Sequence, residues 1–199
     1  MILSHYTHFA NTNYINEIPS SSVFDWSDPK YHGLICAPDF LLRAGNGFLG
    51  LMYEPEAMID LHRYLINSND MLVTNDCDAL LLSGERPLTY MGYGLPFDLL
   101  DGGHIRPFWN PGMGTNLFSH AIASDAPHPN AAKLFAAWSS SQRAANLSWT
   151  SIRQGWPAYG VINDIAPNFN YKNMVFESPD TYRLRAERTR YFQDALFGK

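Results

Sequence analysis

The sequence is poor in cysteine, in charged residues and in long apolar runs, and each shortage excludes a class of protein. Two cysteines, Cys36 and Cys77, occur in 199 residues, which is too few for a disulfide framework, and one bridge or none remains open. Charged residues make up 17% and the formal net charge is -5. This balance argues against a general nucleic-acid binder, because such proteins carry a basic face. No apolar run reaches the length of a membrane-spanning helix.

The start of the chain has no recognisable signal peptide, since neither a basic residue nor an apolar stretch precedes a small-residue cleavage site. We therefore expect a cytosolic protein, or a chain whose export signal lies elsewhere. Hydrophobic residues make up 46%, a share that predicts a globular chain rather than a disordered one. The length suits one ordinary domain or two small lobes.

Short apolar stretches alternate with helical patterns along the chain, which predicts an α/β fold. Residues 1–14 are expected to be extended, and strands are expected at residues 33–37, 87–93, 105–109 and 117–123. A short helical turn is expected at residues 24–30, and helices at residues 54–66, 76–83, 97–100, 131–138 and 181–196. A glycine loop is expected at residues 44–47.

The letters GNGFLG at residues 45–50 match the dinucleotide fingerprint G-x-G-x-x-G, with Asp70 near the spacing expected for a ribose contact. The fingerprint requires a tight strand-to-helix turn whose helix N-terminus faces the pyrophosphate. Pro55 comes too soon for a long helix to run on from Gly50, and the strand at Leu34 lies too far upstream. A plain loop is the default interpretation, a loop whose amides hold an anionic group is the second, and a dinucleotide-dependent enzyme is the alternative.

No other motif predicts catalysis, a metal site or a cofactor. The chain has no G-x-S-x-G nucleophile elbow and no zinc-ligand spacing. His5 and His8 would face opposite sides of an extended segment, so we interpret them as surface or hinge polarity. The arginines at positions 183, 185, 188 and 190 are interpreted as a solvated face of the closing helix.

Aromatic residues surround two predicted strand ends, and two interpretations of them stay open. These residues are Tyr90, Tyr93, Phe97, Phe108 and Trp109. They could pack in the core. Alternatively, they could form an aromatic wall for a ligand, with tyrosine hydroxyls supplying polar contacts.

Several segments carry a resemblance to a known family. DWSDPKYHGLI at residues 25–35 is similar to W-x-D-L-x-D-P-x-Y-K-G-K-I, and LSGERPL at residues 82–88 is similar to S-G-E-x-P-I. APHPNAAKLF at residues 126–135 is close to a third family segment, and residues 190–198 resemble the usual C-terminal helix. In this order they resemble bacterial extracellular solute-binding proteins of the family-one group, the binding components of ABC importers. Around Gln142 the chain departs from the family spacing, because Ser139, Ser140 and Ser141 replace it.

The resemblance implies a non-enzymatic, periplasmic binding protein that captures a small solute between two α/β lobes and delivers it to an ABC permease. The expected fold is a lobe of the type II periplasmic-binding-protein kind, with hinge strands and C-terminal helices. The N-terminal part of the first lobe is expected to lie outside this chain. Residues 1–19 would form a first hinge segment, residues 20–116 the second lobe, and residues 117–199 a return hinge strand and helices that pack on the first lobe.

The resemblance also places the ligand-binding residues. They are Asn46, Gly47, Tyr90, Tyr93, Trp109, Asn110 and Thr115. The solute is a small molecule or a metal ion. Ferric-iron binders in this family place adjacent tyrosines in this region, whereas Tyr90 and Tyr93 are separated, which weakens the iron interpretation.

The missing first-lobe portion would leave an apolar stripe of Leu134, Phe135 and Trp138 uncovered. Monomers rarely tolerate large exposed apolar patches. We therefore expect self-association, exchange of an element, or a piece with weak affinity for its ligand. An interaction protein that kept one lobe and lost ligand binding is a further alternative.

Overall fold

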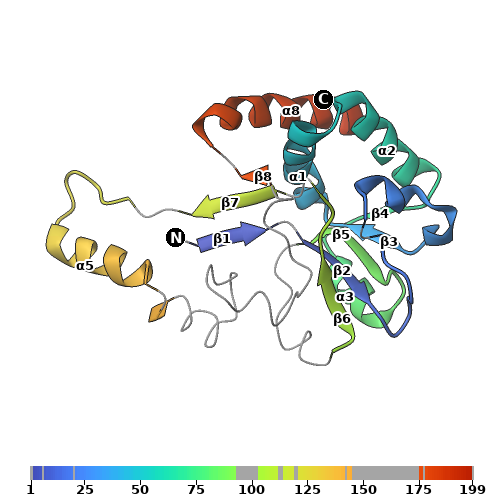
Figure 1. Ribbon diagram of the computed structural model, residues 1–199, viewed down its shortest axis with the longest axis horizontal. Coiled ribbons are helices and arrows are strands. Elements are labelled where there is room, and N and C mark those ends of the chain that lie inside the picture. The colour runs from blue at the N-terminus through green and yellow to red at the C-terminus, as the bar shows by residue number, and fades with distance from the viewer. Residues whose placement is uncertain are drawn as a thin grey trace.

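The computed structural model describes residues 2–5, 7–19, 21–92, 103–111, 114–118, 121–141, 143–144, 175–176 and 178–198, and it has the predicted α/β architecture (Figure 1). One sheet has the order β1-β7-β8, with β1 at Ile2–His5, β7 at Gly114–Phe118 and β8 at Val175–Phe176. The other has the order β4-β3-β5-β2-β6, with β2 at Thr7–Asn11, β3 at Ile35–Ala37, β4 at Leu72–Val73, β5 at Leu88–Gly92 and β6 at Ile105–Phe108. The chain therefore passes between the sheets twice, from β1 to β2 and from β6 to β7.

The described helices other than α5 lie on the faces of the five-stranded sheet or beside it. They are η1 (Val23–Ser27), η2 (Pro29–Tyr31), α1 (Asp39–Met52), α2 (Pro55–Asn67), α3 (Cys77–Ser83), α5 (Pro129–Ser139) and α8 (Pro179–Phe197). The predictions of α2, α3, α5 and α8 are confirmed. Proline occupies the first turn of α2, α5 and α8, where its missing N–H costs no helical hydrogen bond. Gly84 ends α3 in the left-handed region, with a φ of 79°.

Three predicted elements differ in the structure. The glycine loop at residues 44–47 is wrong, because this segment lies inside α1. The strand expected at residues 117–123 is β7, which ends at Phe118, and residues 121–123 form no strand. The single helical turn at residues 24–30 is two short 3-10 helices. The helix expected at residues 97–100 lies outside the described residues.

Close packing against α8 explains why a glycine-rich segment is helical. A Cβ atom at Gly47 would collide with the side chain of Thr189, and one at Gly50 would lie 2.7 Å from the ring of Phe192. Phe192 is fully buried. The two glycines therefore let the backbones of α1 and α8 approach closely. Glycine-rich segments occur both in loops and where two helices pack closely, so the sequence alone does not distinguish the two.

The arginines of α8 divide between this contact and solvent, so the prediction of a uniformly solvated face is wrong. The guanidinium of Arg185 lies 4.7 Å from the centroid of the Phe48 ring. The side chain of Arg188 lies against Gly50. Arg183 and Arg190 are exposed. Arginine can cover apolar surface with its stem while its charge stays near water.

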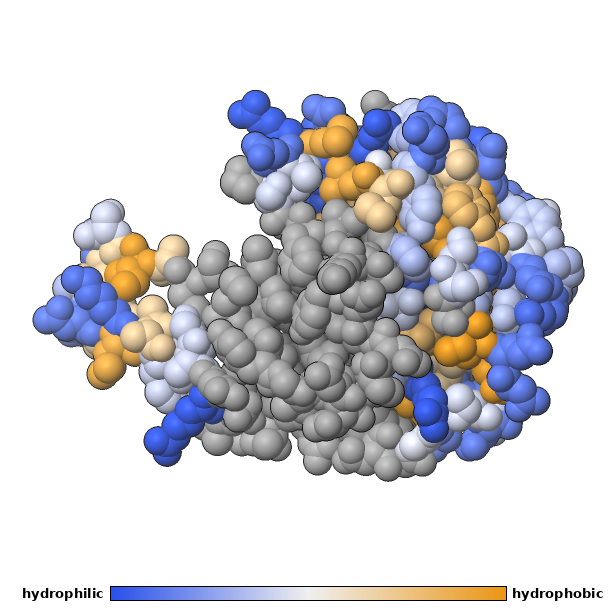
Figure 2. Space-filling model, viewed as in Figure 1, coloured by the Kyte–Doolittle hydropathy of each residue, from blue (hydrophilic) through white to orange (hydrophobic). Residues whose placement is uncertain are grey.

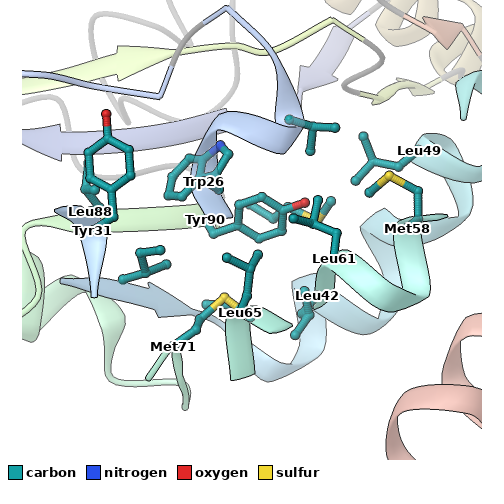
Figure 3. Close-up of a cluster of buried hydrophobic side chains, with 14 of the residues drawn as sticks. Trp26, Tyr31, Leu42, Leu49, Met58, Leu61, Leu65, Met71, Leu88 and Tyr90 are labelled. Carbon is teal, nitrogen blue, oxygen red and sulfur yellow. The ribbon is translucent and has the colours of Figure 1, made fainter. Parts of the chain in front are cut away.

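The main core lies between the five-stranded sheet, α1, α2 and the 3-10 helices, as Figure 3 shows. Its largest fully buried side chains include those of Trp26, Tyr90, Phe48 and Met58. A second cluster of Phe9, Leu81 and Ile105 lies where α3 covers the opposite face. Together these clusters fix the positions of the strand ends, which matter for the site.

Helix α5 stands apart from the other described elements (Figure 1). None of its residues is buried, and Leu134 is 72% exposed. Phe135 and Trp138 are also exposed, and apolar surface gathers on this helix in Figure 2. The predicted apolar stripe is therefore present and uncovered, whereas self-association stays a prediction.

The three predicted segments, residues 1–19, 20–116 and 117–199, stay a prediction as well. Within the described chain, α8 packs on α1 and α2. The closing helix therefore contacts elements of the predicted second lobe. No helix that the structure describes is long and apolar enough to cross a membrane.

Candidate functional site

The carboxyl edge of the five-stranded sheet is the candidate site. Strands β4, β3 and β5 are parallel, and β2 runs antiparallel to both β5 and β6. The carboxyl ends of β3, β5 and β6, at Ala37, Gly92 and Phe108, therefore lie at one edge. Ligands of open α/β sheets bind outside the carboxyl ends of the strands. We call the ends of these three strands and the residues directly after them the carboxyl edge.

Of the residues predicted to bind ligand, Trp109 and Asn110 lie at this edge, and the other described ones lie within helices or strands. Trp109 and Asn110 directly follow β6, and Asn46 and Gly47 belong to α1, which begins just after β3. Tyr93 would directly follow β5 but lies outside the described residues. Two further predicted residues, Tyr90 and Thr115, lie within β5 and β7. Among the described residues, the topology thus places the Trp109–Asn110 segment of the predicted site at this edge, whereas Thr115 belongs to the other sheet.

Helix α1 begins at the carboxyl edge without a side-chain cap. Its N-cap is Pro38, and no side chain accepts from the first turn. Asp39 instead pairs with Arg43, whose Nε lies 2.9 Å from Oδ1 of the carboxylate. The ring of Phe40 is 69% exposed. This end of α1 thus presents backbone N–H groups and an aromatic surface.

Asn46 is buried in the middle of α1. Its side chain is 0% exposed, and neither amide atom has a hydrogen-bond partner among the described residues. Gly47 faces α8 rather than an open surface. Packing against α8 thus explains why position 47 is glycine. The buried amide of Asn46 without a partner is unusual in a native protein.

Tyr90 lies in the core, as one of the two interpretations of the aromatic residues had it. Its ring is fully buried and lies between Trp26 and Leu61 in Figure 3. The ring centroids of Tyr90 and Trp26 are 4.9 Å apart. Burial raises the pKa of the phenol above its usual value. This hydroxyl does not reach the surface, which removes one of the two tyrosines considered for iron.

His8 is fully buried, so its interpretation as surface or hinge polarity is wrong. Its ring stacks on Tyr90 at 5.0 Å and contacts Trp26 and Phe108. Its Nδ1 accepts the backbone N–H of Met91 at 3.1 Å. Burial lowers the pKa of His8 to about 3, and an interaction with Asn110 opposes that shift only in part. His8 is therefore a neutral acceptor at the start of β2.

Asn110 connects the end of β6 to the segment before η1. Its Oδ1 accepts the indole N–H of Trp26 at 2.7 Å, and its Nδ2 donates to the carbonyl oxygen of Pro19 at 2.7 Å. The residue is 1% exposed. Trp109 is half-buried beside it. Through these two bonds Asn110 holds the end of β6 against Trp26 and Pro19.

His62 on α2 completes the polar part of the core. Its Nδ1 lies 2.6 Å from the carbonyl oxygen of Met58, so Nδ1 carries the proton and donates. Burial lowers its pKa to about 4. Neither His62 nor Trp26 was predicted to belong to the site. The helical spacing of Met58, Leu61 and Leu65 places His62 on the buried face and could have revealed it.

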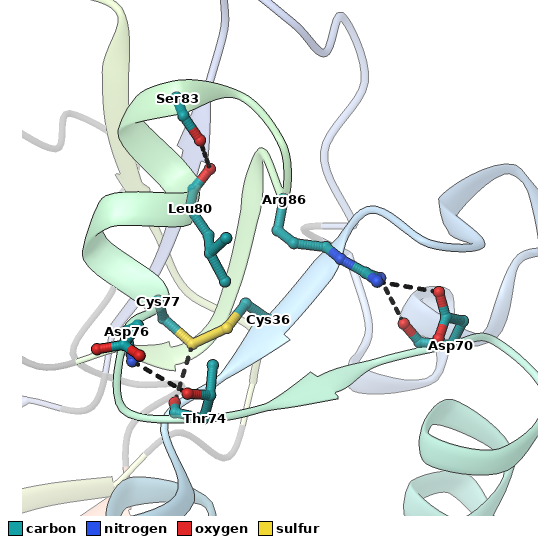
Figure 4. Close-up of a disulfide and its surroundings, with 8 residues drawn as sticks. All are labelled: Cys36, Asp70, Thr74, Asp76, Cys77, Leu80, Ser83 and Arg86. Carbon is teal, nitrogen blue, oxygen red and sulfur yellow. Dashed lines mark hydrogen bonds and ion pairs between the residues drawn. A yellow bond between two sulfur atoms is a disulfide. The ribbon is translucent and has the colours of Figure 1, made fainter.

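Cys36 and Cys77 form a disulfide, which settles the open question of the sequence (Figure 4). Cys36 lies in the middle of β3 and Cys77 opens α3, 41 positions later. Both residues are buried. The bridge ties α3 to the strand that leads into the carboxyl edge. Such bridges persist in oxidising compartments and are rare in the cytosol.

A polar hollow of about 710 Å³ lies beside residues 17–31, but its charged side chains already bond to other groups of the chain. Lys30 Nζ lies 2.7 Å from Glu17 Oε2 and 3.4 Å from Asp28 Oδ2. Asp25 accepts from the backbone N–H of Ser22 at 2.8 Å as part of the η1 cap. No three His, Cys, Asp or Glu side chains of the described residues gather into a metal-binding group. The carboxyl edge therefore remains the candidate.

Comparison with solved structures identifies the fold. A substrate-binding protein of an ABC transporter from Agrobacterium tumefaciens matches with a TM-score of 0.61 and 13% identity, over 98% of this chain and 66% of that one. Apo ferric ion-binding protein A from Pasteurella haemolytica matches with a TM-score of 0.72 and 13% identity, over 100% of this chain and 69% of that one. A periplasmic thiamin-binding protein matches with a TM-score of 0.66 and 14% identity, over 98% and 64%.

The chain thus has the fold of periplasmic substrate-binding proteins and spans 66% of the first of these proteins and 64% of the third. The expected fold class and the resemblance to solute-binding proteins are confirmed at this level. No family model matches the sequence, and no curated protein matches it.

Proposed function

We propose that the chain is part of a solute-binding protein of an ABC importer, and that the carboxyl edge supplies one side of its ligand site. The observation that carries the proposal is the topology: two sheets joined by two chain crossings, with the strand ends of the larger sheet gathered at the crossings. The three solved structures named above are a substrate-binding protein of an ABC transporter, a thiamin-binding protein and a ferric ion-binding protein, which supports a binding role. The proposed action is capture and release, without a chemical step.

The carboxyl edge supports capture of a small solute with an anionic or polar group. The start of α1 presents N–H groups without a side-chain cap, and a helix N-terminus favours negative charge. Phe40 adds exposed aromatic surface beside it. Trp109 and Thr115, from the segments that follow β6, complete the proposed ligand-binding set with Tyr93. An iron site built on Tyr90 is disfavoured because its hydroxyl is buried.

An incomplete site accounts for the exposed apolar face of α5. The matched proteins extend beyond the aligned region by about a third of their length. We propose that a counterpart of that third covers Leu134, Phe135 and Trp138 and closes the ligand site from the other side. A second copy of this chain, or an interaction protein that has lost its ligand, is the alternative.

A periplasmic location and delivery to a permease belong to the same proposal. The Cys36–Cys77 disulfide supports an oxidising compartment outside the cytosol. The described part of the chain has no further cysteine. Delivery to a permease rests on the fold alone.

The dinucleotide enzyme is disfavoured as an alternative. The fingerprint glycines lie within α1, which begins at Asp39, rather than in a turn between a strand and the first turn of a helix. Gly47 and Gly50 face α8. Their backbone N–H groups are therefore not gathered around an open phosphate site.

A thermal-shift screen tests the proposal, run beside mass measurement by light scattering. The panel contains ferric citrate, thiamine, putrescine, spermidine, a phosphonate and NAD. A solute at a hundred times its Kd adds about 2.7 kcal/mol of stability, which raises the Tm by several degrees. A shift with one importer-type solute supports the proposal. A shift with NAD alone contradicts it. No shift together with a dimer mass favours the self-associating alternative.

A further inference from the structure

Met91, at the carboxyl edge, has a backbone conformation that residues other than glycine rarely adopt. Its φ is 58°, and its side chain is 1% exposed. The pairing of β2 with β5 shifts between Thr7 and Phe9, so that one residue of β2 faces two of β5. This is a β-bulge, and a left-handed residue at a bulge is usually glycine. The outlier at Met91 therefore needs a partner that holds it.

His8 is that partner. The backbone N–H of Met91 donates to His8 Nδ1 at 3.1 Å, in a fully buried position. An N–H group can only donate, so Nδ1 is unprotonated and the neutral ring carries its proton on Nε2. The ring cannot tilt away, because Trp26, Tyr90 and Phe108 surround it.

The position of this contact links it to the proposed site. Met91 and Gly92 are the last two residues of β5, so the contact lies at the carboxyl end of that strand. Phe108, whose ring centroid lies 5.2 Å from that of His8, is the last residue of β6. His8 thus touches the ends of two of the three strands that form the carboxyl edge.

We propose that His8 is a positioning residue for the carboxyl edge: by accepting the Met91 N–H, it holds the left-handed conformation of Met91 one residue before the end of β5. Its effect on the backbone stands by itself, and its effect on ligand affinity rests on the proposed function. Other buried aromatic rings could fill the same space. The proposed role of His8 is to accept the Met91 N–H at Nδ1, which a ring without an acceptor cannot do.

A comparison of glycine with alanine at position 91 reports on the backbone directly. Met91→Gly and Met91→Ala both remove the side chain, but glycine tolerates a positive φ at lower cost. The left-handed conformation costs a residue with a Cβ about 1–2 kcal/mol, so Met91→Gly should melt about 2–8 °C above Met91→Ala. In a His8→Phe background, which keeps a ring but lacks the acceptor, this difference should vanish or reverse.

His62→Phe is the matched control. His62 is equally buried and also packs against Tyr90, but its Nδ1 bonds Met58 rather than Met91. This variant should lower the Tm and leave the order of glycine above alanine unchanged. If His8→Phe also leaves that order unchanged, His8 only fills space and the proposal is overturned.

Two further measurements test the proposal on folded protein. One determines the tautomer of His8 in the wild-type chain, and the other measures ligand affinity in the variants. Nitrogen-15 shifts of His8 in the wild-type chain should show a protonated Nε2 and a bare Nδ1, and the reverse tautomer contradicts the proposal. For any panel solute that binds the wild type, His8→Phe should weaken affinity at least tenfold and His62→Phe should not. If no solute binds, the proposed function fails, while the order at position 91 still decides the positioning role.

Discussion

The backbone of Arg185 on α8 lies so close to Gly47 on α1 that a Cβ atom at Gly47 would be 2.9 Å from its carbonyl oxygen. Glycine inside a helix usually costs about 1 kcal/mol relative to alanine. We predict that Gly47→Ala nevertheless destabilises the chain, by about 1–3 kcal/mol, because α8 must move away. Urea unfolding measures this change.

A second substitution separates the two contacts of Gly47. The Thr189 side chain also lies against it, so Thr189→Ala in the Gly47→Ala background should recover part of the loss, while the Arg185 carbonyl remains in contact. A gain in stability from Gly47→Ala alone, as helix propensity predicts, would contradict the observed packing.

The disulfide supplies the second prediction. Closing a loop of 41 positions should stabilise the fold by about 4 kcal/mol through the unfolded chain. Reduction, or the double substitution Cys36→Ser with Cys77→Ser, should therefore lower the free energy of unfolding by about that amount. Addition of reductant to the double variant is the control and should change nothing. Equal unfolding curves with and without reductant would show that the bridge does not form.

The two buried histidines predict a pH dependence between pH 6.5 and pH 5. Their folded pKa values are lowered to about 3 for His8 and about 4 for His62, against 6.5 in the unfolded chain. In this window the unfolded state binds more protons, so stability falls as the pH falls. Each histidine should contribute a loss of about 2 kcal/mol at pH 5.

Urea unfolding at several pH values, in the wild type and in His62→Phe, tests this dependence. The variant should show about half of the wild-type slope, because His8 is then the one buried histidine among those whose burial the structure describes. A slope that is unchanged in His62→Phe would mean that other groups cause the pH dependence.

Asn110 supplies the fourth prediction. Asn110→Leu removes the acceptor of the Trp26 indole and the donor to Pro19, which leaves two polar groups unpaired. Each unpaired buried group costs about 1–3 kcal/mol, so we expect a loss of about 2–6 kcal/mol. Asn13→Leu, at an exposed position, is the control and should change stability little. Stability of Asn110→Leu equal to that of the control would contradict the role of Asn110.

Local patterns predicted most of the elements. Proline at the first turn and glycine after the last turn marked several helix ends, and apolar runs marked β3 and β6. The segment at residues 44–47 failed because glycine favours loops by its own conformational freedom, whereas α1 uses it for contact with α8. That contact joins residues more than a hundred positions apart, and no local pattern encodes it.

The site could be predicted only by region. The resemblance placed Trp109 and Asn110, which lie at the carboxyl edge, among the ligand-binding residues, but it did not predict the accessibility of each side chain. Tyr90 and Asn110 differ from exposed contacts only through tertiary burial, which depends on Trp26 and on strand pairing. The burial of His8 could not be predicted, because a polar residue in an extended segment is normally expected at the surface. Its role as an acceptor depends on the bulge at Met91, which the local sequence does not reveal.

Amide chemical shifts of nitrogen-15-labelled chain, recorded with and without millimolar amounts of each panel solute, test the central claim most directly. Even a half-site of low affinity should then bind measurably. The proposal predicts that one importer-type solute shifts the amides of Phe40, Gly92 and Trp109 at the carboxyl edge and leaves the amides of α3 unchanged. Shifts confined to other surfaces, or shifts with NAD alone, would show that the carboxyl edge is not a solute site.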